Sequence, residues 1–470
     1  MRSLPGGSAA PRPGRRARGA RLALRGSLGV LLLAAPALGG NEDELFVGND
    51  AALSGGAVTA TVRDGSALYY NPAGLARVPR DSVDLTASAF VLRGYRLPEL
   101  LSASNGDGAP GDFVEIVSAP SGLSYVRRLS PALVAAAGVF VPRSLDLVLR
   151  SSLPLVVDGR SASALAALGV SQSRYVAALG LGLRVSRRLS VGLALHGIYD
   201  GGTLSSLFAG GFVSTVAPAA ARSVADFASD GFVQQQIIFS RTNVGFEPAW
   251  GLQLELGEHV RCGLALRGPG VSLYSWQHGT TVESQGGPDL DVFRPQDVPR
   301  SGFVVQRMLA LRSMAALAYY FGASWIALEA DYQSRVYSER LGVDVVPVVN
   351  ARLGGRLQLS EALALGGGLF SDRSNEPTPR GYPDTHMDFY GASAGFELST
   401  AYALAAGQAS SSVAFSTTLG LRYAHGSGQV GGVRVDLSAP AAAEVGRVTT
   451  PAGPVSVDEL SLHIGSAVYF

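Results

Sequence analysis

Histidine and cysteine, the side chains from which many catalytic and metal sites are built, are scattered in this sequence. There is one cysteine, Cys262, and no two of the six histidines stand at an HxxxH or HExxH spacing. Neither a zinc pair on a helix nor a cysteine metal knuckle is therefore predicted, and no P-loop occurs. We expect no catalytic residue, no metal and no cofactor. The histidines are His196, His259, His278, His386, His425 and His463.

Charged side chains instead recur with the period of two that places them on one face of a strand. Glu329 and Asp331 do so within 324–337, and Arg352 and Arg356 do so within 348–359. One interpretation is a set of cross-strand ion pairs that tie down whatever fills the interior. The other is that Arg352 or Arg356 binds the carboxylate of a ligand through its guanidinium fork. We favour the ion pairs, because acidic residues lie within reach.

The segments that carry these residues alternate as strands do. In 82–93, Val83 and Leu85 would face one side, and Asp84 and Thr86 the other, over the ~9–11 residues with which a tilted strand crosses a bilayer. Fourteen such runs are predicted: 82–93, 113–127, 132–142, 174–186, 190–200, 244–256, 260–273, 302–318, 324–337, 348–359, 362–371, 387–399, 411–425 and 457–470.

The connections between these runs alternate in length. Short links are expected to alternate with long external loops, which is typical of outer-membrane barrels. The expected long loops are 94–112, 143–173, 201–243, 274–301, 338–347, 372–386 and 426–456.

Composition narrows the class of protein. Charged residues make up 16% of the 470 residues and the mean hydropathy is +0.22, which is apolar for a soluble chain. Residues 1–39 have a basic stretch, a short apolar run and small residues at the end, so we predict a cleaved signal peptide. Without its seven arginines the chain keeps 31 basic residues against 37 acidic ones, which argues against a nucleic-acid partner. A soluble exported β-rich protein, an enzyme included, and a transmembrane β-barrel remain open.

A compact bend follows the predicted signal peptide. In Tyr69-Tyr70-Asn71-Pro72-Ala73-Gly74, Pro72 cannot continue a strand ladder and Gly74 admits backbone angles closed to other residues. The segment resembles the N-terminal plug of the FadL/OmpP1/TodX family of outer-membrane channels, in which Asn-Pro-Ala follows a Tyr-Tyr or Phe-Tyr pair. The chain also ends on Phe470 after alternating apolar residues, which resembles the signal read by the outer-membrane insertion machinery.

This resemblance implies an all-β fold: a transmembrane antiparallel barrel of about 14 strands with an N-terminal plug, or hatch, inside the lumen. The expected divisions are a signal peptide at 1–39, a plug at 40–80 and a barrel at 81–470. It further implies passive uptake of hydrophobic compounds, such as long-chain fatty acids or aromatic hydrocarbons, across the outer membrane of a Gram-negative bacterium, in contact with its lipid and lipopolysaccharide. The family's kinked third strand opens a sideways exit, and Gly138 is our candidate for that kink.

Two of the expected external loops are unusually apolar. One contains the leucine-rich residues 145–149, and the other contains Phe208 and Phe212. Apolar surface of this kind tends to mark binding sites, so Phe208 and Phe212 are candidate substrate contacts, together with Arg352 and Arg356. Alternatively, these segments pack on each other as a lid. At the level of the whole protein, a structural or secretion-associated barrel that moves no lipid also stays open.

Overall fold

The computed structural model describes residues 41, 44–103, 108–157, 160–213, 231–286, 292–341, 343–379, 384–404, 411–436 and 446–470. The predicted signal peptide lies outside these residues. Three short helices come first: α2 (Asn49–Leu53), α3 (Ala67–Tyr70) and the 3-10 helix η1 (Pro72–Arg77). The strands are β1 (Ser82–Ala103), β2 (Gly108–Arg128), β3 (Leu133–Val157), β4 (Arg160–Arg184), β5 (Leu189–Val213), β6 (Gly231–Glu255), β7 (Val260–Arg267), β8 (Gly270–Gly286), β9 (Val292–Leu309), β10 (Arg312–Phe321), β11 (Ser324–Gln333), β12 (Val336–Ser338), β13 (Val343–Val345), β14 (Val348–Gln358), β15 (Leu363–Asp372), β16 (Thr385–Leu404), β17 (Ser411–Asp436) and β18 (Gly446–Tyr469).

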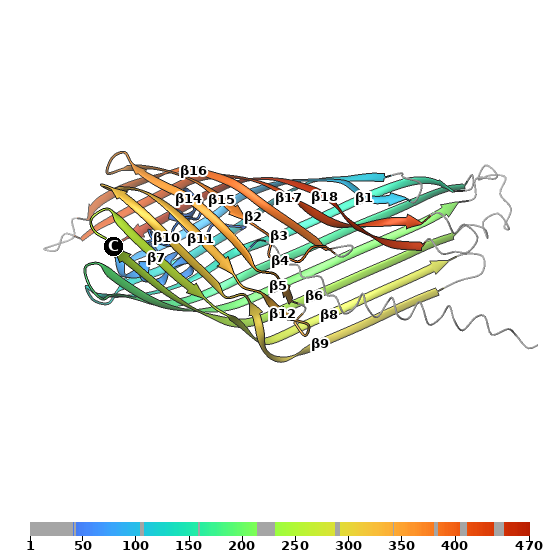
Figure 1. Cartoon of the computed structure of the whole chain (residues 1–470), viewed down its shortest axis with the longest axis horizontal. Helices are drawn as coiled ribbons and strands as arrows, with labels where there is room; N and C mark the ends of the chain where they lie inside the picture. The colour runs from blue at the N-terminus through green and yellow to red at the C-terminus, as the bar shows by residue number, and fades with distance from the viewer. Residues whose placement is uncertain are drawn as a thin grey trace, which may run out of the picture.

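The strands close into a single antiparallel barrel (Figure 1). From β1 to β6 and from β14 to β18 each strand pairs with the next in chain order, β10 pairs with β7 and β11, β11 pairs with β14, and β1 pairs with β18 to complete the ring. Strand β6 pairs with β7 along one half and with β8 along the other, so β7 and β8 occupy one position in the wall, as do β9 and β10. The wall therefore has the 14 strands expected from the sequence, with the β12–β13 hairpin as a separate small sheet.

Side chains alternate between an apolar exterior and a polar interior. On β11, Leu328 is 60% exposed, whereas its neighbours Glu329 and Asp331 are each 1% exposed. Aromatic residues follow one another across neighbouring outward positions: Tyr175 pairs with Tyr199, and Tyr274 with Phe303, with ring centroids 6.0 and 5.9 Å apart. An apolar outer band edged by aromatic residues is the exterior of a transmembrane barrel.

The strands are much longer than predicted. At ~3.3 Å per residue, the 25 residues of β5 span roughly 80 Å, more than twice the ~30 Å apolar core of a bilayer. Most of the predicted loop 143–173 belongs to β3 and β4, and the ends of 201–243 belong to β5 and β6. Figure 1 shows these strands running far beyond the ends of β10, β11, β14 and β15. The prediction of long loops here was wrong, because the strands continue past the lipid, where long-range pairing and not the lipid-facing pattern decides between strand and loop.

The barrel wall has a break between β2 and β3. These strands pair only from Gly122 with Phe140 to Arg128 with Val134. The β3–β4 ladder is also irregular immediately above, between Phe140 and Arg143, where Pro142 has no N–H to donate. Gly138, by contrast, is paired in register with both neighbours, Ser124 and Ala178. The predicted kink at Gly138 was therefore wrong, and the irregularity lies at residues 141–142.

Candidate functional site

The described residues from 44 to 78, here called the N-terminal segment, lie inside the lower part of the barrel, near the short turns. Nearly all of their side chains are buried, and they form one apolar cluster with inward residues of the wall. Figure 1 shows the segment in blue within the ring of strands. Members of this lower cluster include Phe46, Val47, Leu68, Tyr69, Tyr70, Leu75, Phe140 and Phe370.

Asn71 and Pro72 set the bend that the sequence indicates. The Asn71 side-chain oxygen accepts from the Ala73 N–H at 3.1 Å, and Pro72 occupies the start of η1, where a free N–H is not needed. The Asn71 amide donates to the Thr59 carbonyl at 2.7 Å and to the Leu252 carbonyl of β6 at 3.2 Å. One buried residue thus caps a helix and joins the segment to the wall.

Glycines on the inner face of the wall admit this bend. A Cβ atom added to Gly192 of β5 would lie 2.1 Å from the carbonyl carbon of Pro72, and one added to Gly251 of β6 would lie 2.0 Å from Asn71 Oδ1. Both distances are far inside van der Waals contact, so only glycine allows the two backbones to approach this closely.

The tyrosines of the motif are buried between the segment and the wall. Tyr70 accepts a hydrogen bond from the Val47 N–H at 3.2 Å, and the Tyr69 ring lies 4.2 Å from the Arg267 guanidinium carbon. His196 also faces the lumen. Its Nε2 lies 2.9 Å from the Leu68 carbonyl oxygen and its Nδ1 lies 3.2 Å from Glu247.

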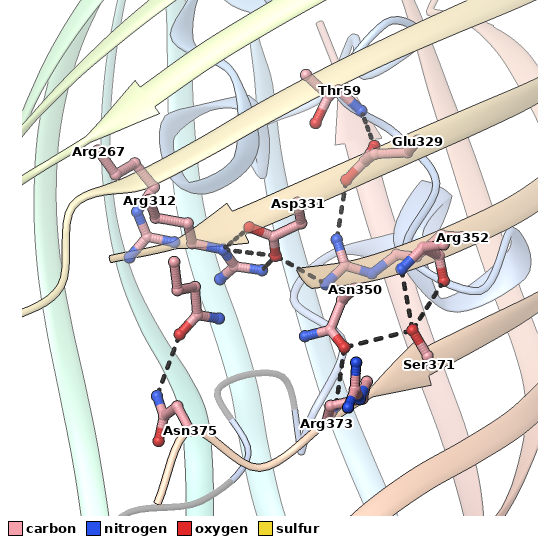
Figure 2. A network of polar contacts seen from close by, with 12 residues as sticks. Thr59, Arg267, Arg312, Glu329, Asp331, Asn350, Arg352, Ser371, Arg373 and Asn375 are labelled. Carbon is pink, nitrogen blue, oxygen red and sulfur yellow. Dashed lines mark hydrogen bonds and ion pairs between the residues drawn. The ribbon is translucent and has the colours of Figure 1, made fainter. Parts of the chain in front are cut away.

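A buried polar network links the N-terminal segment to β10, β11 and β14 (Figure 2). Glu329 accepts from the Thr59 N–H at 2.8 Å and pairs with Arg352 at 2.8 Å. Arg352 also reaches Asp331 at 3.3 Å, and Asp331 accepts from Arg312 Nε at 3.0 Å. These contacts are those of the ion-pair interpretation, and we assign Arg352 no ligand.

Arg356 is held in the same way. Its guanidinium lies 3.2 Å from Asp50 of α2 and 3.1 Å from Glu397 of β16. Both arginines considered as substrate contacts therefore make ion pairs with carboxylates in the lower half of the lumen, where the N-terminal segment lies.

The upper half of the lumen contains a second apolar cluster. The tip of β1 leaves β18 and pairs in parallel with β17 at Leu101 and Val433, which brings it against the inner faces of β3, β4 and β5. Phe208, predicted in a loop, lies on β5 with 2% exposure inside this cluster. Phe212 lies further along β5, where the structure describes its backbone only. Members of this upper cluster include Tyr95, Leu97, Leu100, Leu101, Leu147, Leu149, Leu153, Leu168, Leu204 and Phe208.

A cavity of about 50 Å³ lies between the two clusters. Tyr95, Leu145, Met387 and Phe389 supply an apolar part of its lining, and the rest is mostly charged. The charged residues are Glu44, Arg93, Arg143, Asp372, Glu376, Arg422 and Glu459. Its volume is far below the ~300–1,000 Å³ of sites for drug-sized ligands, so it is a small gap in the filled interior, lined mostly by polar residues.

Motifs for catalysis or metal binding gain no support in the described part of the chain. No group of three or more histidine, cysteine, aspartate or glutamate side chains there has the geometry of a metal site. Residues 391–395 have a GxSxG spacing, but they lie within β16 and lack the strand-to-helix turn of a nucleophile elbow. Within the described ranges, no helix combines the length and apolarity that crossing a membrane requires.

The carboxyl-terminal strand keeps the predicted alternation. Leu460 and Ile464 are exposed on the outside, whereas Glu459 and His463 are buried on the inside. The Phe470 N–H donates to the Asp81 carbonyl at 3.0 Å, so the two ends of the barrel meet. A role for Phe470 in assembly stays a prediction.

The barrel, the segment within it and the apolar exterior define an outer-membrane type of β-barrel with a filled lower lumen. The chain is similar in structure to a Pseudomonas aeruginosa FadL homologue, with 12% identity, a TM-score of 0.56 and coverage of 91% of this chain and 99% of that one. It is also similar to the Pseudomonas putida toluene transporter TodX, with 15% identity, a TM-score of 0.54 and coverage of 90% and 98%. The Ralstonia pickettii toluene transporter TbuX matches with 12% identity, a TM-score of 0.52 and coverage of 92% and 99%.

These matches confirm the expected fold. No protein-family model and no curated protein sequence matches the chain.

Leu147, Leu149 and Phe208 pack in one cluster, as the lid alternative expected of their segments, although they do so as faces of β3 and β5 and not as loops. Sequence reasoning missed the break in the wall and the inward tip of β1. Leu147, Leu149 and Leu153 already alternate with other positions, which is a signal for one buried strand face. What the sequence lacks is any mark that the β1 tip folds inward. Arg93 and Glu115 lie opposite each other on the paired strands β1 and β2, and Glu44 joins them from the N-terminal segment, a contact that no local pattern records.

Proposed function

We propose that the protein is a passive channel for hydrophobic compounds in the outer membrane of a Gram-negative bacterium. The substrates would be small greasy molecules such as long-chain fatty acids or aromatic hydrocarbons. Solutes of this kind partition poorly through a lipopolysaccharide leaflet, and a protein-lined apolar path lowers that barrier. No energy source is involved, so the direction of movement follows the concentration gradient.

The observation that carries this proposal is the sequence of environments along the lumen. An apolar cluster fills the upper part, a cavity with apolar and charged lining follows, and the N-terminal segment fills the lower part. A water-filled pore would need a continuous polar lumen instead. Similarity to solved structures whose names describe a FadL homologue and toluene transporters agrees with this proposal.

In this proposal the N-terminal segment, with the surrounding residues 40–80, is the plug. Substrate enters from the outside through the upper cluster, reaches the cavity, and leaves past the plug or sideways through the β2–β3 break. The outer band contacts membrane lipid and lipopolysaccharide, and the outer-membrane insertion machinery recognises the terminal strand with Phe470. The protein is not an enzyme.

Ligand retention provides the first test. The protein is purified from outer membranes in mild detergent, and its bound small molecules are identified by mass spectrometry. We expect co-purifying hydrophobic molecules at near-stoichiometric amounts. A folded, heat-modifiable protein that carries none and does not accelerate uptake of a fluorescent fatty acid or of toluene into liposomes would support the scaffold alternative.

Phe208 provides a second test. We expect Phe208→Asp combined with Phe212→Asp to lower uptake at least tenfold, because a carboxylate at position 208 would be buried among apolar side chains. The control is Phe208→Leu, which keeps the position apolar. Unchanged uptake by the folded double variant would exclude this region from the path.

A further inference from the structure

The break between β2 and β3 is closed by side chains in place of a backbone ladder. Above Phe140, Glu115 of β2 accepts from the Asp146 N–H of β3 at 2.9 Å. Glu44 of the N-terminal segment accepts from the Ser144 N–H at 3.2 Å. The Leu45 N–H donates to the Pro142 carbonyl at 3.1 Å. Main-chain groups of β3 that a neighbouring strand would satisfy are thus satisfied by two carboxylates and one residue of the N-terminal segment.

One arginine holds both carboxylates in place. Arg93 of β1 lies 3.9 Å from Glu44 and 3.9 Å from Glu115, and its Nε is 2.6 Å from Glu459. Arg143, 2% exposed, lies 3.7 Å from Glu44. Because Arg93 and Glu115 are also at most 5% exposed, water screens these charge interactions little, and they favour both carboxylates at this position although neither is within hydrogen-bond distance of Arg93.

This closure separates two environments. On its inner side, Glu44, Arg93 and Arg143 line the cavity between the two apolar clusters. On the outer face of β2, Val114 and Ile116 are 64% and 70% exposed, in the apolar band. Between the two, Leu45 packs against Val91 and Val117. Opening the closure would connect the cavity directly with membrane lipid.

We propose that Glu44 and Glu115 are positioning residues that keep this lateral opening shut by taking the place of the missing strand partner. The identity of any molecule that passes through the opening depends on the proposed function, whereas the role of the two carboxylates in closing it does not. Removing either carboxylate leaves a β3 N–H unsatisfied, so the closure loosens while the remaining ladders, which do not depend on these two carboxylates, stay intact.

The test measures access to position 45 without any substrate. In a Cys262→Ala background, the Leu45→Cys variant is labelled with N-ethylmaleimide in lipid nanodiscs, and the labelling rate is followed by mass spectrometry. We expect Glu115→Ala to accelerate labelling at least tenfold. Glu115→Gln, which keeps an oxygen acceptor for the Asp146 N–H, is expected to stay within about twofold of the parent. Equal acceleration by both variants, or by neither, overturns the proposal.

Two further variants separate this role from general loosening. Asp200→Ala removes another buried, arginine-paired carboxylate, located on β5 and paired with Arg174 and Arg241 of the barrel wall, and should leave labelling at position 45 unchanged. Asp146→Pro removes the N–H donor from the β3 side and should accelerate labelling at position 45 as Glu115→Ala does. If one of these two variants fails to fold, the other still tests the same hydrogen bond.

For Glu44 the labelled position is Val117→Cys. Glu44→Ala should accelerate labelling there, whereas Glu44→Gln should not. Transport is measured separately, so loss of transport with an intact closure would count against the proposed function alone.

Discussion

The lower and upper halves of the barrel interior are filled by different kinds of contact. The lower half holds the N-terminal segment through directional hydrogen bonds and ion pairs, among them Asn71 to Leu252 and Glu329 to Thr59, in addition to the apolar contacts of the lower cluster. The upper half is filled by the β1 tip and strand faces that meet through aliphatic side chains. Apolar contacts have no preferred direction and can slide or re-form, whereas a buried ion pair has one good geometry.

The difference indicates a rigid lower half and a yielding upper half. A buried charge that loses its partner costs several kcal/mol, so the N-terminal segment has one well-defined position inside the barrel. A greasy molecule that enters the upper cluster exchanges one apolar contact for another, at little cost. An opening at the top is therefore easier than release of the whole N-terminal segment, and the following variants test this ranking.

The largest effect is expected at the closest approach between segment and wall. Gly192→Val would drive a side chain into the Pro72 backbone, since even its Cβ would lie 2.1 Å from the carbonyl carbon. We expect the cost to exceed the ~1–3 kcal/mol typical of overpacked cores, with loss of the seated segment. Limited proteolysis should then cut within residues 44–78 while the barrel stays heat-modifiable.

The matched control is Gly197→Ala on the same strand. A Cβ there meets only the Ala177 carbonyl oxygen, at 3.7 Å, which is an ordinary contact. Its proteolysis pattern should equal that of the parent protein. A Gly192→Val protein with a protected segment would show that the lower half is less rigid than we infer.

A smaller loss is expected from Arg352→Met. It leaves Glu329 without its guanidinium partner, although Asp331 keeps Arg312. Breaking a buried pair in this way costs ~3–5 kcal/mol, which should lower the temperature of the heat-modification transition. Adding Glu329→Gln removes the stranded charge and keeps an acceptor for the Thr59 N–H, so the double variant should recover much of the loss. No recovery would mean that the network holds the segment through something other than charge balance.

The sequence predicted the lipid-crossing part of each strand because lipid imposes a strict pattern. On β11 and β14 the outward residues are large and apolar and the inward ones polar, so the faces of Glu329 and Arg352 were predicted correctly. The bend at Asn71-Pro72 was also predicted from the sequence, since a proline preceded by an asparagine that can cap a helix seldom occurs within a strand. Above the lipid, serine, glycine and alanine are compatible with strand or loop, and long-range pairing decides between them.

The break in the wall shows where local reading fails. Glycine at 138 suggested a bend, but many glycines in this barrel serve close packing, as at Gly192. The irregularity lies instead at residues 141–142. Pro142 cannot donate a ladder hydrogen bond, and whether this interrupts the sheet depends on which strand lies beside it. Glu44 and Glu115 act as acceptors for N–H groups of β3 only because β2 does not pair with β3 there, and no local sequence pattern records a missing strand partner.

The yielding upper half is tested by Leu100→Ala together with Leu101→Ala. Both leucines are fully buried in the upper cluster, and each truncation should cost ~2–5 kcal/mol where the site cannot collapse. We expect faster amide hydrogen exchange over residues 97–103, with little change in η1. Faster exchange in both regions would show that the two halves open as one unit.

The last effect concerns pH, where no contact is removed. Burial, reinforced by the charges of Asp50 and Asp84, raises the pKa of Asp64 in the N-terminal segment to about 8. A released segment has an ordinary aspartate pKa of ~3.9, so between these values the seated state holds a proton that the released state does not. The stability of the seated segment is therefore greatest below pH ~4 and declines as the pH rises toward 8.

Asp64→Asn resembles the protonated carboxyl at every pH and keeps an oxygen for the Ser66 N–H, which donates to it at 2.9 Å. The heat-modification midpoint of the parent should fall between pH 5 and pH 9, and that of the variant should fall less. Exchange protection of residues 97–103 should be alike in both proteins once corrected for intrinsic rates, because the upper cluster lies apart from Asp64 and is almost entirely aliphatic. A variant with the parent's full pH dependence would place the titrating group elsewhere, and a parallel change in the upper cluster would mean that seating of the lower segment also controls the top.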